Sequence, residues 1–164
     1  MKKILLILIL ILFTAAFFGC SAPETNSVQM GNPWTTHSSL KEAEKAVGFP
    51  LGLPETVADT CRAEEFRDMN GELLEVVYID GSRTVTLRKA KGTGQDISGD
   101  YTQYDTTQTE SHYGIEVTIQ YYRDGENASV LVLFSRDGFS YSLSAPDGFS
   151  GDSFDDFLRA AAEE

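Results

Sequence analysis

Histidine, cysteine and positive charge are scarce in this chain, and each scarcity argues against a class of site or protein. The 164 residues include two histidines, two cysteines and one tryptophan. His37 and His112 are far apart in the sequence and give no metal-ligand spacing, so we expect no metal site. Basic residues number 13 against 25 acidic ones, and the net charge of −12 argues against nucleic acid as a partner.

Motifs for catalysis are also lacking. Gly92-Thr93-Gly94 does not complete a dinucleotide fingerprint, because Ile97 occupies the position of the third glycine. No serine lies between glycines at the spacing of a nucleophile elbow. We therefore expect no catalytic residue, no cofactor and no enzymatic activity.

The remaining candidate metal and catalytic sites consist of acidic residues. Residues 124–127 (Asp-Gly-Glu-Asn) and the segment from Asp152 to Asp156 gather oxygen ligands as Ca²⁺ requires. Neither fits a calcium-loop pattern, and turn chemistry and helix capping explain both. Four glutamates either supply a carboxylate pair for glycoside hydrolysis or form the solvated face of a hairpin. They are Glu64, Glu65, Glu72 and Glu75.

The composition is that of one folded domain. Hydrophobic residues make up 41% and charged residues 23% of the chain, a balance typical of globular proteins and not of disordered ones. A length of 164 residues suits a single core of ordinary size.

The first residues have the pattern of a signal peptide. Lys2 and Lys3 precede residues 4–18, which are apolar except for Thr14. A helix over this segment would be roughly 22 Å long, shorter than the ~30 Å hydrocarbon core of a bilayer. We therefore predict a signal peptide over residues 1–19 rather than a membrane span.

The end of this segment resembles the processing site of bacterial lipoproteins, because Cys20 directly follows the small residue Gly19. Phe17 and Phe18 stand where that site usually has a leucine and a small residue. The resemblance implies that the Cys20 thiol receives a diacylglycerol and that cleavage follows Gly19. Acyl chains such as palmitate would then anchor the protein in the cell membrane at its extracytoplasmic face. An uncleaved anchor helix and an ordinary secretory peptide are the alternatives.

The net charge and the cysteine content of the rest of the chain are compatible with lipidation of Cys20. Removing Lys2 and Lys3 changes the net charge from −12 to −14, and a lipid anchor needs no basic patch. Only Cys61 remains after Cys20, so no disulfide forms within the domain once Cys20 is acylated. We expect Cys61 to be a small buried side chain rather than a reactive thiol.

Residues 20–37 are predicted to form a flexible tether, because they contain prolines, Gly31 and several hydroxyl residues with little apolar periodicity. A flexible chain of this length spans roughly 20–25 Å. Trp34 is the exception in the tether, and it either docks on the domain or touches the membrane interface.

The globular domain is predicted over residues 38–164, with a helix at each end. Residues 39–42 (Ser-Leu-Lys-Glu) have the form of a capping box, and Gly48 is a stop signal for the first, short helix. Residues 49–54, with two prolines, should lie extended along the core. Ser150 or Ser153 can cap the second helix. Its apolar stripe is Phe154, Phe157, Leu158 and Ala161.

Turn pairs and alternating apolar residues predict antiparallel strands between the helices. The turn pairs are Asn70-Gly71, Asp80-Gly81, Asp124-Gly125 and Asp137-Gly138, and the clearest strands are residues 84–88, 115–121, 130–134 and 139–143. Residues 130–134 are apolar on both faces, which predicts a central strand. Residues 92–109 form either a surface excursion or a frayed edge strand. The fold class is therefore α+β, with an antiparallel meander sheet of about six or seven strands.

The order of these parts resembles a known bacterial family. The segments that carry the resemblance are residues 39–50 (SLKEAEKAVGFP), Leu53-Pro54, 84–89 (TVTLRK), 96–101 (DISGDY), 113–118 (YGIEVT) and 139–143 (FSYSL). Together they resemble the family called domain of unknown function 4367, over about residues 38–162. That family occurs in extracytoplasmic lipoproteins and in outer parts of membrane proteins related to anti-sigma factors. The resemblance implies the same location and assigns no catalytic residue.

The leading functional hypothesis is a non-catalytic binding or sensing module of the bacterial cell envelope, with a protein, glycan or lipid as its partner. The alternative is a carrier for an apolar ligand, which needs an unfilled apolar cavity on the sheet. A hydrolase with paired carboxylates comes third. Five tyrosines either line a ligand groove or reflect the preference of strands for tyrosine. They are Tyr101, Tyr104, Tyr113, Tyr121 and Tyr122.

Overall fold

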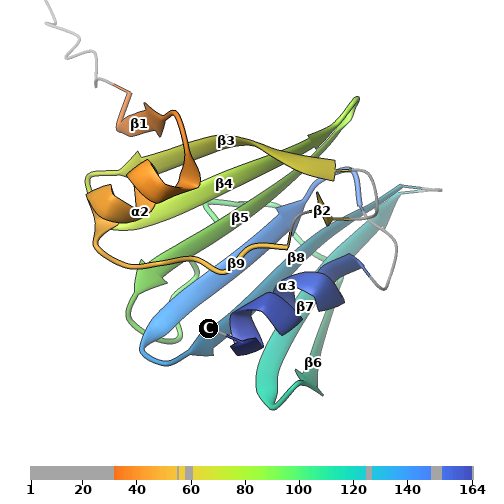
Figure 1. Ribbon diagram of the computed structural model, residues 1–164. Helices are drawn as coiled ribbons and strands as arrows, with labels where there is room; N and C mark the ends of the chain where they lie inside the picture. The colour runs from red at the N-terminus through yellow and green to blue at the C-terminus, as the bar shows by residue number, and fades with distance from the viewer. Residues whose placement is uncertain (1–31, 55, 58–60, 125–126, 149–152, 164) are drawn as a thin grey trace, which may run out of the picture. The chain divides into compact units, whose positions relative to one another are not determined.

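A single antiparallel sheet dominates the computed structural model, which describes residues 32–54, 56–57, 61–124, 127–148 and 153–163 (Figure 1). Its strands are β1 Trp34–His37, β2 Thr56–Val57, β3 Cys61–Met69, β4 Leu73–Asp80, β5 Arg83–Lys91, β6 Thr106–His112, β7 Ile115–Asp124, β8 Asn127–Arg136 and β9 Phe139–Ala145. The helices are α2 Leu40–Val47 and α3 Ser153–Glu163. The strand order is β1-β3-β4-β5-β9-β8-β7-β6, and β2 pairs with β3 outside this row.

The predicted α+β class is confirmed, but the predicted sheet of six or seven strands is too small. Eight strands stand in a row, and the short helix follows β1 instead of preceding the sheet. The simple meander is also wrong at one point, because β5 pairs with β9 and not with β6. Two meanders, β3-β4-β5 and β6-β7-β8-β9, therefore meet in the middle of the sheet.

The end of the predicted tether belongs to this sheet. Residues Trp34–His37 form β1, which pairs antiparallel with β3 in the register Trp34↔Met69 to His37↔Phe66. The backbone hydrogen bonds of this pairing order a segment whose composition predicted a flexible chain. The domain therefore begins before residue 38. Residues 1–31, with the predicted signal peptide and Cys20, lie outside the described residues.

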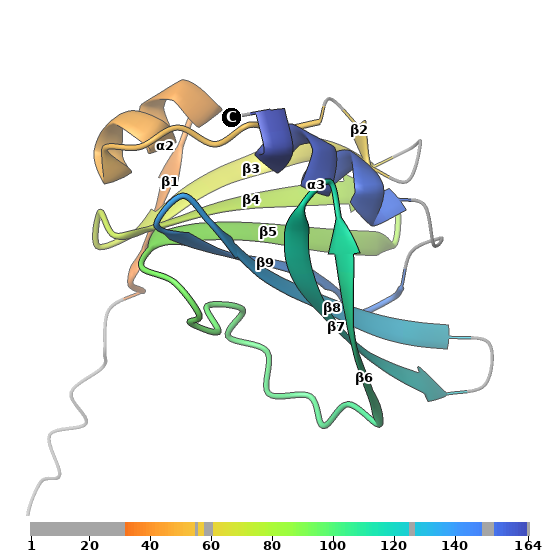
Figure 2. The ribbon, with the colours of Figure 1, turned by 90° about the horizontal axis from the view of Figure 1, so that it is seen from below.

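The two faces of the sheet carry different elements (Figure 2). Helices α2 and α3 cover one face, which we call the helix face. Residues 92–105, which connect β5 to β6, run along the other face, which we call the outer face. We call this connection the strap. The sequence left residues 92–109 open between an excursion and an edge strand, and the structure contains both, because β6 begins at Thr106.

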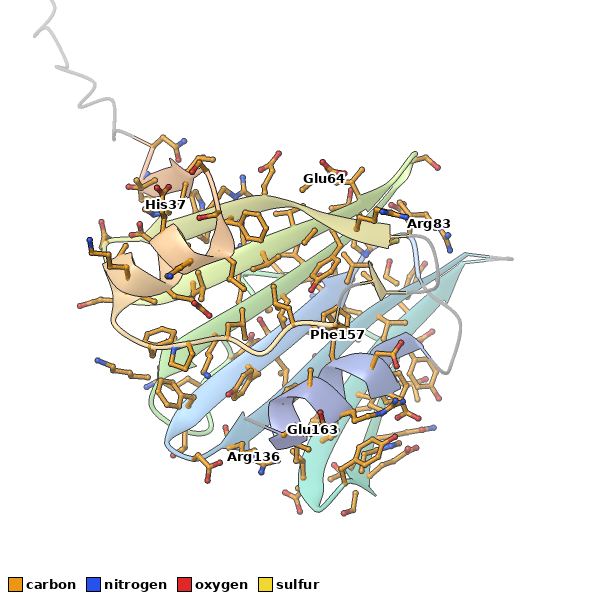
Figure 3. The ribbon with its side chains drawn as sticks, in the orientation of Figure 1. His37, Glu64, Arg83, Arg136, Phe157 and Glu163 are labelled. Atoms are coloured by element: carbon orange, nitrogen blue, oxygen red, sulfur yellow. The ribbon has the colours of Figure 1, made fainter. Side chains whose placement is uncertain are left out.

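The hydrophobic core lies between the sheet and the two helices. Alternate residues of β4, β5, β7, β8 and β9 face it, including Val76 and Tyr78 of β4 and Leu143 of β9, each at most 1% exposed. The ring of Phe157 from α3 meets Tyr78 edge-on at 5.4 Å between centroids, and Figure 3 shows Phe157 pointing from α3 toward the sheet. Cys61 is 1% exposed within the same core, as predicted for a small buried side chain. The stripe predicted for the second helix is therefore the face of α3 that closes the core.

Helix α2 begins and ends where the sequence predicted. Ser39 is its N-cap and accepts a hydrogen bond from Glu42 N, and Gly48 ends it in the left-handed conformation, with φ of 77°. The carboxylate of Glu42 accepts hydrogen bonds from Ser38 rather than from the Ser39 backbone, so the reciprocal half of the capping box shifts by one residue. The predicted caps Ser150 and Ser153 of α3 are not tested, because the placement of Ser150 and of the Ser153 side chain is not described.

Tight turns join most neighbouring strands. Asn70-Gly71 and Asp137-Gly138 both have positive φ, as their sequences predicted for hairpin turns. Tyr113-Gly114 makes the same kind of turn between β6 and β7, with φ of 52° and 78°. A tyrosine rarely adopts this conformation, which is why the sequence analysis did not predict this turn, although the edge strand that it left open for residues 92–109 overlaps the first part of β6.

Candidate functional site

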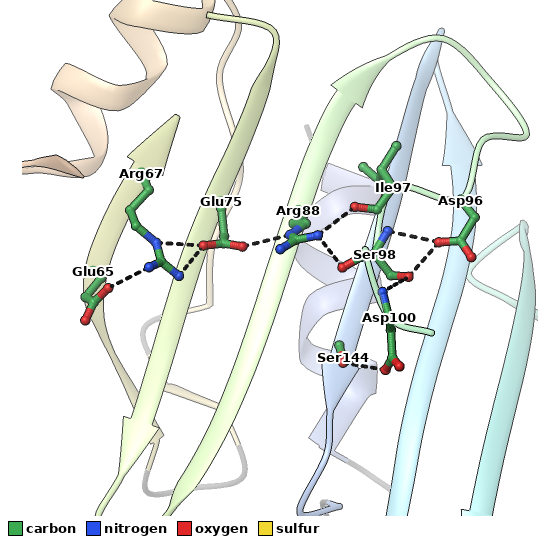
Figure 4. Close-up of polar contacts among 9 residues, drawn as sticks. All are labelled: Glu65, Arg67, Glu75, Arg88, Asp96, Ile97, Ser98, Asp100 and Ser144. Atoms are coloured by element: carbon green, nitrogen blue, oxygen red, sulfur yellow. Dashed lines mark hydrogen bonds and ion pairs between the residues drawn. The ribbon is translucent and has the colours of Figure 1, made fainter. Parts of the chain in front are cut away.

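A row of alternating charges crosses the outer face of the first meander. Arg67 on β3, Glu75 on β4 and Arg88 on β5 are direct cross-strand neighbours, so their side chains project from the same face. Glu75 is 1% exposed and accepts a hydrogen bond of 2.7 Å from the Nε atom of each arginine. Glu65 extends the row and lies 3.4 Å from Arg67. Figure 4 shows the whole row.

Trp34 covers this charge row. Its ring lies 5.3 Å from the Cζ atom of Arg67 and 5.2 Å from that of Arg88, both within the range of cation–π contacts. The position follows from the pairing of Trp34 with Met69, since this register places the indole on the outer face. Of the two positions that the sequence left open for Trp34, the structure shows docking on the domain.

Glu75 corrects the interpretation of the four glutamates. The solvated hairpin face holds for Glu64 and Glu72, which are exposed, but Glu75 is buried. Both of its carboxylate oxygens are occupied by guanidinium groups, so neither is open to a substrate. Removing one partner of such a pair costs about 3–5 kcal/mol, because it leaves a buried charge uncompensated. The carboxylate of Glu75 is therefore engaged in ion pairs within the protein.

Arg88 also fastens the strap to the sheet. Its Nη1 atom donates to the backbone carbonyls of Ile97, at 3.1 Å, and Ser98. Serines of the second meander hold the strap from the other side. Ser135 accepts from Gly94 N at 2.8 Å, and Ser140 accepts from Gln95 N at 3.2 Å and donates to the carbonyl of Gly92.

Asp100 is the strap side chain that contacts the sheet through its carboxylate. It accepts hydrogen bonds from Ser144 on β9, at 3.2 Å, from the Tyr104 hydroxyl, at 2.6 Å, and from the backbone of Thr102. Partial burial opposes its charged form, but these hydrogen bonds outweigh burial and lower the pKa of Asp100. Burial and the bond to Asp100 raise the pKa of Tyr104, so the phenol stays a proton donor.

One buried hydroxyl beneath the strap has no hydrogen-bond partner. Ser142 lies on the outer face of β9 between Ser140 and Ser144, and it is 1% exposed. Its Oγ atom accepts and donates no hydrogen bond in the structure. An unsatisfied buried polar group costs about 1–3 kcal/mol of folding stability.

Two open hollows flank the strap. One, of about 390 Å³, lies between Gly94, Asp96 and the outer face of β7 and β8, where Glu116 and Leu133 line it. The other, of about 560 Å³, has an apolar floor that includes Leu73 and Ala90, and Lys91 lines it as well. Gln95 lines both hollows, so the strap is the wall between them. Both volumes fall in the range of small-ligand sites.

The five tyrosines do not form one groove. Tyr121 faces the core, whereas Tyr122, the next residue, lies on the opposite face and is 41% exposed. Tyr101 on the strap is 94% exposed, and Tyr113 occupies the turn between β6 and β7. Their number therefore reflects strand and turn composition, and the groove that the sequence suggested is not built from them.

The two histidines lie on strands far apart in the sheet order. His37 on β1 lies 2.6 Å from Asp68, and His112 on β6 lies 2.9 Å from Glu110 and 3.3 Å from Asp155 of α3. Each imidazole therefore contacts carboxylates on its own side of the sheet. Within the described residues, no group of three or more histidine, cysteine, aspartate or glutamate side chains is arranged to hold a metal ion. The predicted acidic segments include residues 125–126 and Asp152, whose structure is not described.

Lys89 is a buried cation that the sequence analysis missed. It is 2% exposed on the helix face, its Nζ atom donates to the Pro50 carbonyl at 2.8 Å, and that atom lies 4.5 Å from the ring of Phe139. The signal was present in the strand pattern, since Val85, Leu87 and Lys89 occupy successive inward positions. The carbonyl and aromatic contacts stabilise a charge that would otherwise be costly to bury.

Among the helices that the structure describes, neither is long and apolar enough to cross a membrane. Comparisons of the chain with protein-family models, curated proteins and solved structures gave no match. The resemblance to domain of unknown function 4367 stays a prediction.

Proposed function

We propose that this protein is a lipid-anchored, extracytoplasmic binding module of the bacterial cell envelope and that it performs no catalysis. The observation that carries the proposal is a pair of open hollows, of about 390 and 560 Å³, on the outer face. They lie on either side of the strap, which hydrogen bonds hold against the sheet. Open hollows that combine an apolar floor with polar rims suit reversible binding. The Cys20 motif supplies the anchor in this proposal.

Two charged clusters of the outer face, the row at Glu75 and the carboxylate of Asp100, favour binding over chemistry. Arg67 and Arg88 occupy the oxygens of Glu75, and Tyr104 and Ser144 occupy the carboxylate of Asp100. A general acid or base needs a proton-carrying atom within reach of the substrate. The hydrogen bonds on these groups serve the fold and the strap instead.

The packing weakens the alternative of a carrier for an apolar ligand. Such a carrier needs an unfilled apolar cavity on the sheet. On the helix face Phe157, Leu158 and Ala161 of α3 pack into the core, each at most 4% exposed, and on the outer face the apolar floor near Leu73 belongs to an open hollow and not to an enclosed cavity. The third hypothesis, a hydrolase, needs two convergent carboxylates. Of the four glutamates proposed for it, Glu65 and Glu75 share Arg67.

The anchor and the binding face are tested separately. For the anchor, mass spectrometry of the membrane-extracted protein should show a diacylglyceryl group on Cys20. The Cys20→Ser variant should leave the membrane fraction, because it lacks the thiol that accepts the lipid. Wild-type protein found in the cytosol without lipid would contradict the proposal.

For the binding face, backbone amide resonances are followed during titration with cell-wall muropeptides, soluble envelope glycans and phospholipid micelles. We expect one of these probes to shift the amides of Gln95 and Leu133, which line the hollows, while Leu158 in the core stays unchanged. Leu133→Arg places a large charged side chain in the smaller hollow and should weaken binding there. Absence of a shift with every probe would contradict a binding function, as would turnover of a probe.

A further inference from the structure

We propose that β6 is an interface between two copies of this chain, which pair edge to edge and antiparallel in a register centred on Thr109. The proposal concerns the edge of the sheet and does not depend on the binding function proposed above. The two copies would form one continuous sheet, in which directly opposite residues share a face, so both outer faces would lie on the same side.

Strand β6 is the long open edge of the sheet. It stands at one end of the strand row, and in the part of the chain that the structure describes it pairs only with β7. Every residue from 107 to 111 is exposed. The opposite end of the row differs, because β1 and β2, of four and two residues, share the edge of β3 between them. A second strand therefore finds its longest continuous edge at β6.

The edge of β6 lacks the usual protection against pairing. Soluble proteins guard such edges with lysine, proline or a β-bulge, because unpaired backbone groups pair readily with other strands. The strand, with the sequence TTQTESH, contains neither lysine nor proline. Its pairing with β7 runs from Thr106↔Tyr121 to His112↔Ile115 without a register shift, so no bulge bends it away.

The turn at Tyr113-Gly114 determines which backbone groups point outward. A two-residue turn with positive φ at both positions closes on a hydrogen-bonded pair, here His112↔Ile115, and bonded and non-bonded pairs alternate from there. The residues at the non-bonded positions direct their N–H and C=O groups away from β7. They are Thr107, Thr109 and Ser111.

These outward groups select one register for a second copy. When the pairing is centred on Thr109, this residue lies opposite itself, and Thr107 lies opposite Ser111 of the second copy. All the outward groups of both strands then pair, which gives about six backbone hydrogen bonds. The opposed side chains are all hydroxyls on the outer face, and hydroxyl pairs between neighbouring strands are stabilising.

The acidic residues favour the same register. Glu110 comes opposite Gln108 of the second copy, and Asp105 comes opposite Tyr113, so no two carboxylates are direct neighbours. Gln108 uses one N–H for the Tyr121 hydroxyl and has a second one for a carboxylate. Like charges placed directly opposite would destabilise the pairing, and this register avoids them. The strand is therefore complementary to a second copy of itself.

The dimer should be weak, closed and strengthened by salt. Backbone bonds without a large apolar area predict a dissociation constant of about 100 μM. Assembly stops at two copies, because an isologous contact uses the same edge of both chains. A net charge of −12 on each chain opposes association, and salt screens this repulsion. A basic strand of another protein would instead bind this acidic chain less tightly as salt is added.

The experiment is sedimentation velocity of the full chain, with detergent in excess so that two copies do not share a micelle. Concentrations from about 10 μM to about 1 mM bracket the expected constant. Thr109→Asp places two carboxylates opposite each other and should weaken the dimer about fivefold. Thr109→Pro removes an outward N–H at the centre of the interface and should weaken it further, while the bonds to β7 remain. Thr93→Asp is the control, since it adds the same charge at an exposed residue of the strap and should leave the constant unchanged.

Disulfide trapping tests the register. Opposed residues at Thr109 have Cα atoms about 5.5 Å apart, within the range of a disulfide, so Thr109→Cys should cross-link two copies under mild oxidation. Thr107→Cys is the matched control, because its two copies are more than about 13 Å apart in this register. Cys61 is buried and is the same in both variants.

Three results would overturn the inference. The first is a wild type that stays monomeric up to about 1 mM protein, well above the expected constant. The second is association that weakens as salt is added, which would assign the edge to a basic strand of another protein. The third is equal cross-linking of Thr109→Cys and Thr107→Cys, which would exclude the register. Circular dichroism confirms that each variant is folded, and the proposed binding function stands or fails separately, since the hollows do not include Thr109.

Discussion

The two faces of the sheet are covered through different kinds of contact. The helix face is covered by Phe157, Leu158 and their neighbours, which pack against apolar strand residues. The outer face holds Glu75 between two arginines and binds the strap through serines and carbonyl groups. Apolar packing is not directional, whereas hydrogen bonds and ion pairs require specific geometry. The comparison indicates that apolar packing dominates the first face and that directional polar contacts dominate the second.

The largest expected effect concerns the helix face. Phe157→Ala removes the ring that meets Tyr78 at 5.4 Å, and it should lower the free energy of unfolding by about 4 kcal/mol. Denaturant titration followed by circular dichroism measures this change. Arg159→Ala on the exposed side of the same helix is the control and should change stability by less than about 1 kcal/mol. Similar losses for both variants would show that α3 is not anchored through its apolar face.

A second prediction tests whether the charge row is needed for stability or for specificity. Glu75→Gln leaves two arginines without their carboxylate, and it should destabilise the protein by about 3 kcal/mol. Replacing the three central residues of the row with Arg67→Met, Glu75→Leu and Arg88→Met should recover most of this loss, because the one charge left without its partner, Glu65, is not buried. The triple variant should still release the strap, as faster hydrogen exchange of residues 94–98 would show. A triple variant no more stable than Glu75→Gln would contradict this division of roles.

Alanine substitutions of two neighbouring serines on the outer face should change the free energy of unfolding in opposite directions. Ser142→Ala removes a buried hydroxyl without a partner and should raise the unfolding free energy by about 1 kcal/mol. Ser140→Ala loses contacts with Gln95 and Gly92 and should lower it by about 1 kcal/mol. Both variants change the same atom type on the same strand face, so each is the control for the other. Equal signs would mean that Ser142 has a partner in solution.

The smallest expected effect is a dependence of the free energy of unfolding on pH, caused by the titration of Asp68. Burial opposes its charged form, but hydrogen bonds from His37 and Gly71 outweigh it and lower the pKa of Asp68 below its ordinary value of 3.8. A carboxyl with a lowered folded-state pKa stabilises the fold above its unfolded pKa and loses that contribution as the pH falls through the folded pKa. The stability difference between the wild type and Asp68→Asn should therefore shrink below pH 3.8. A difference that stays constant through this acid range would show that Asp68 does not titrate with folding.

The sequence predicted the helix face better than the outer face. The apolar spacing of α3 and the Ser39 and Gly48 caps of α2 depend on local periodicity and local hydrogen bonds, which are visible in the chain itself. The pairing of β5 with β9 and of β1 with β3 depends on residues far apart, so the strand number and the end of the tether were wrong. Propensity alone does not determine such non-local pairing.

The candidate site was harder to predict because it also depends on the pairing of strands that lie far apart in the sequence. Glu75 and Arg88 look like ordinary exposed charges on alternating strands, and only the strand register places them side by side. The register is itself altered at Glu64, where β3 has a bulge between Ala63 and Glu65 that keeps Phe66 and Cys61 on the buried side. The strap's polar composition predicted an excursion, but nothing in the sequence indicated which surface it would cross.

The junction of β5 with β9 also has a consequence for how the chain folds. The first meander can form as soon as its three strands have been synthesised, but its inner edge at β5 stays open until β9 arrives. An open strand edge is prone to pair with other chains during this interval. Delayed synthesis or truncation before Phe139 would therefore leave a half-sheet that aggregates, and folding of this protein should be limited by arrival of its last strand.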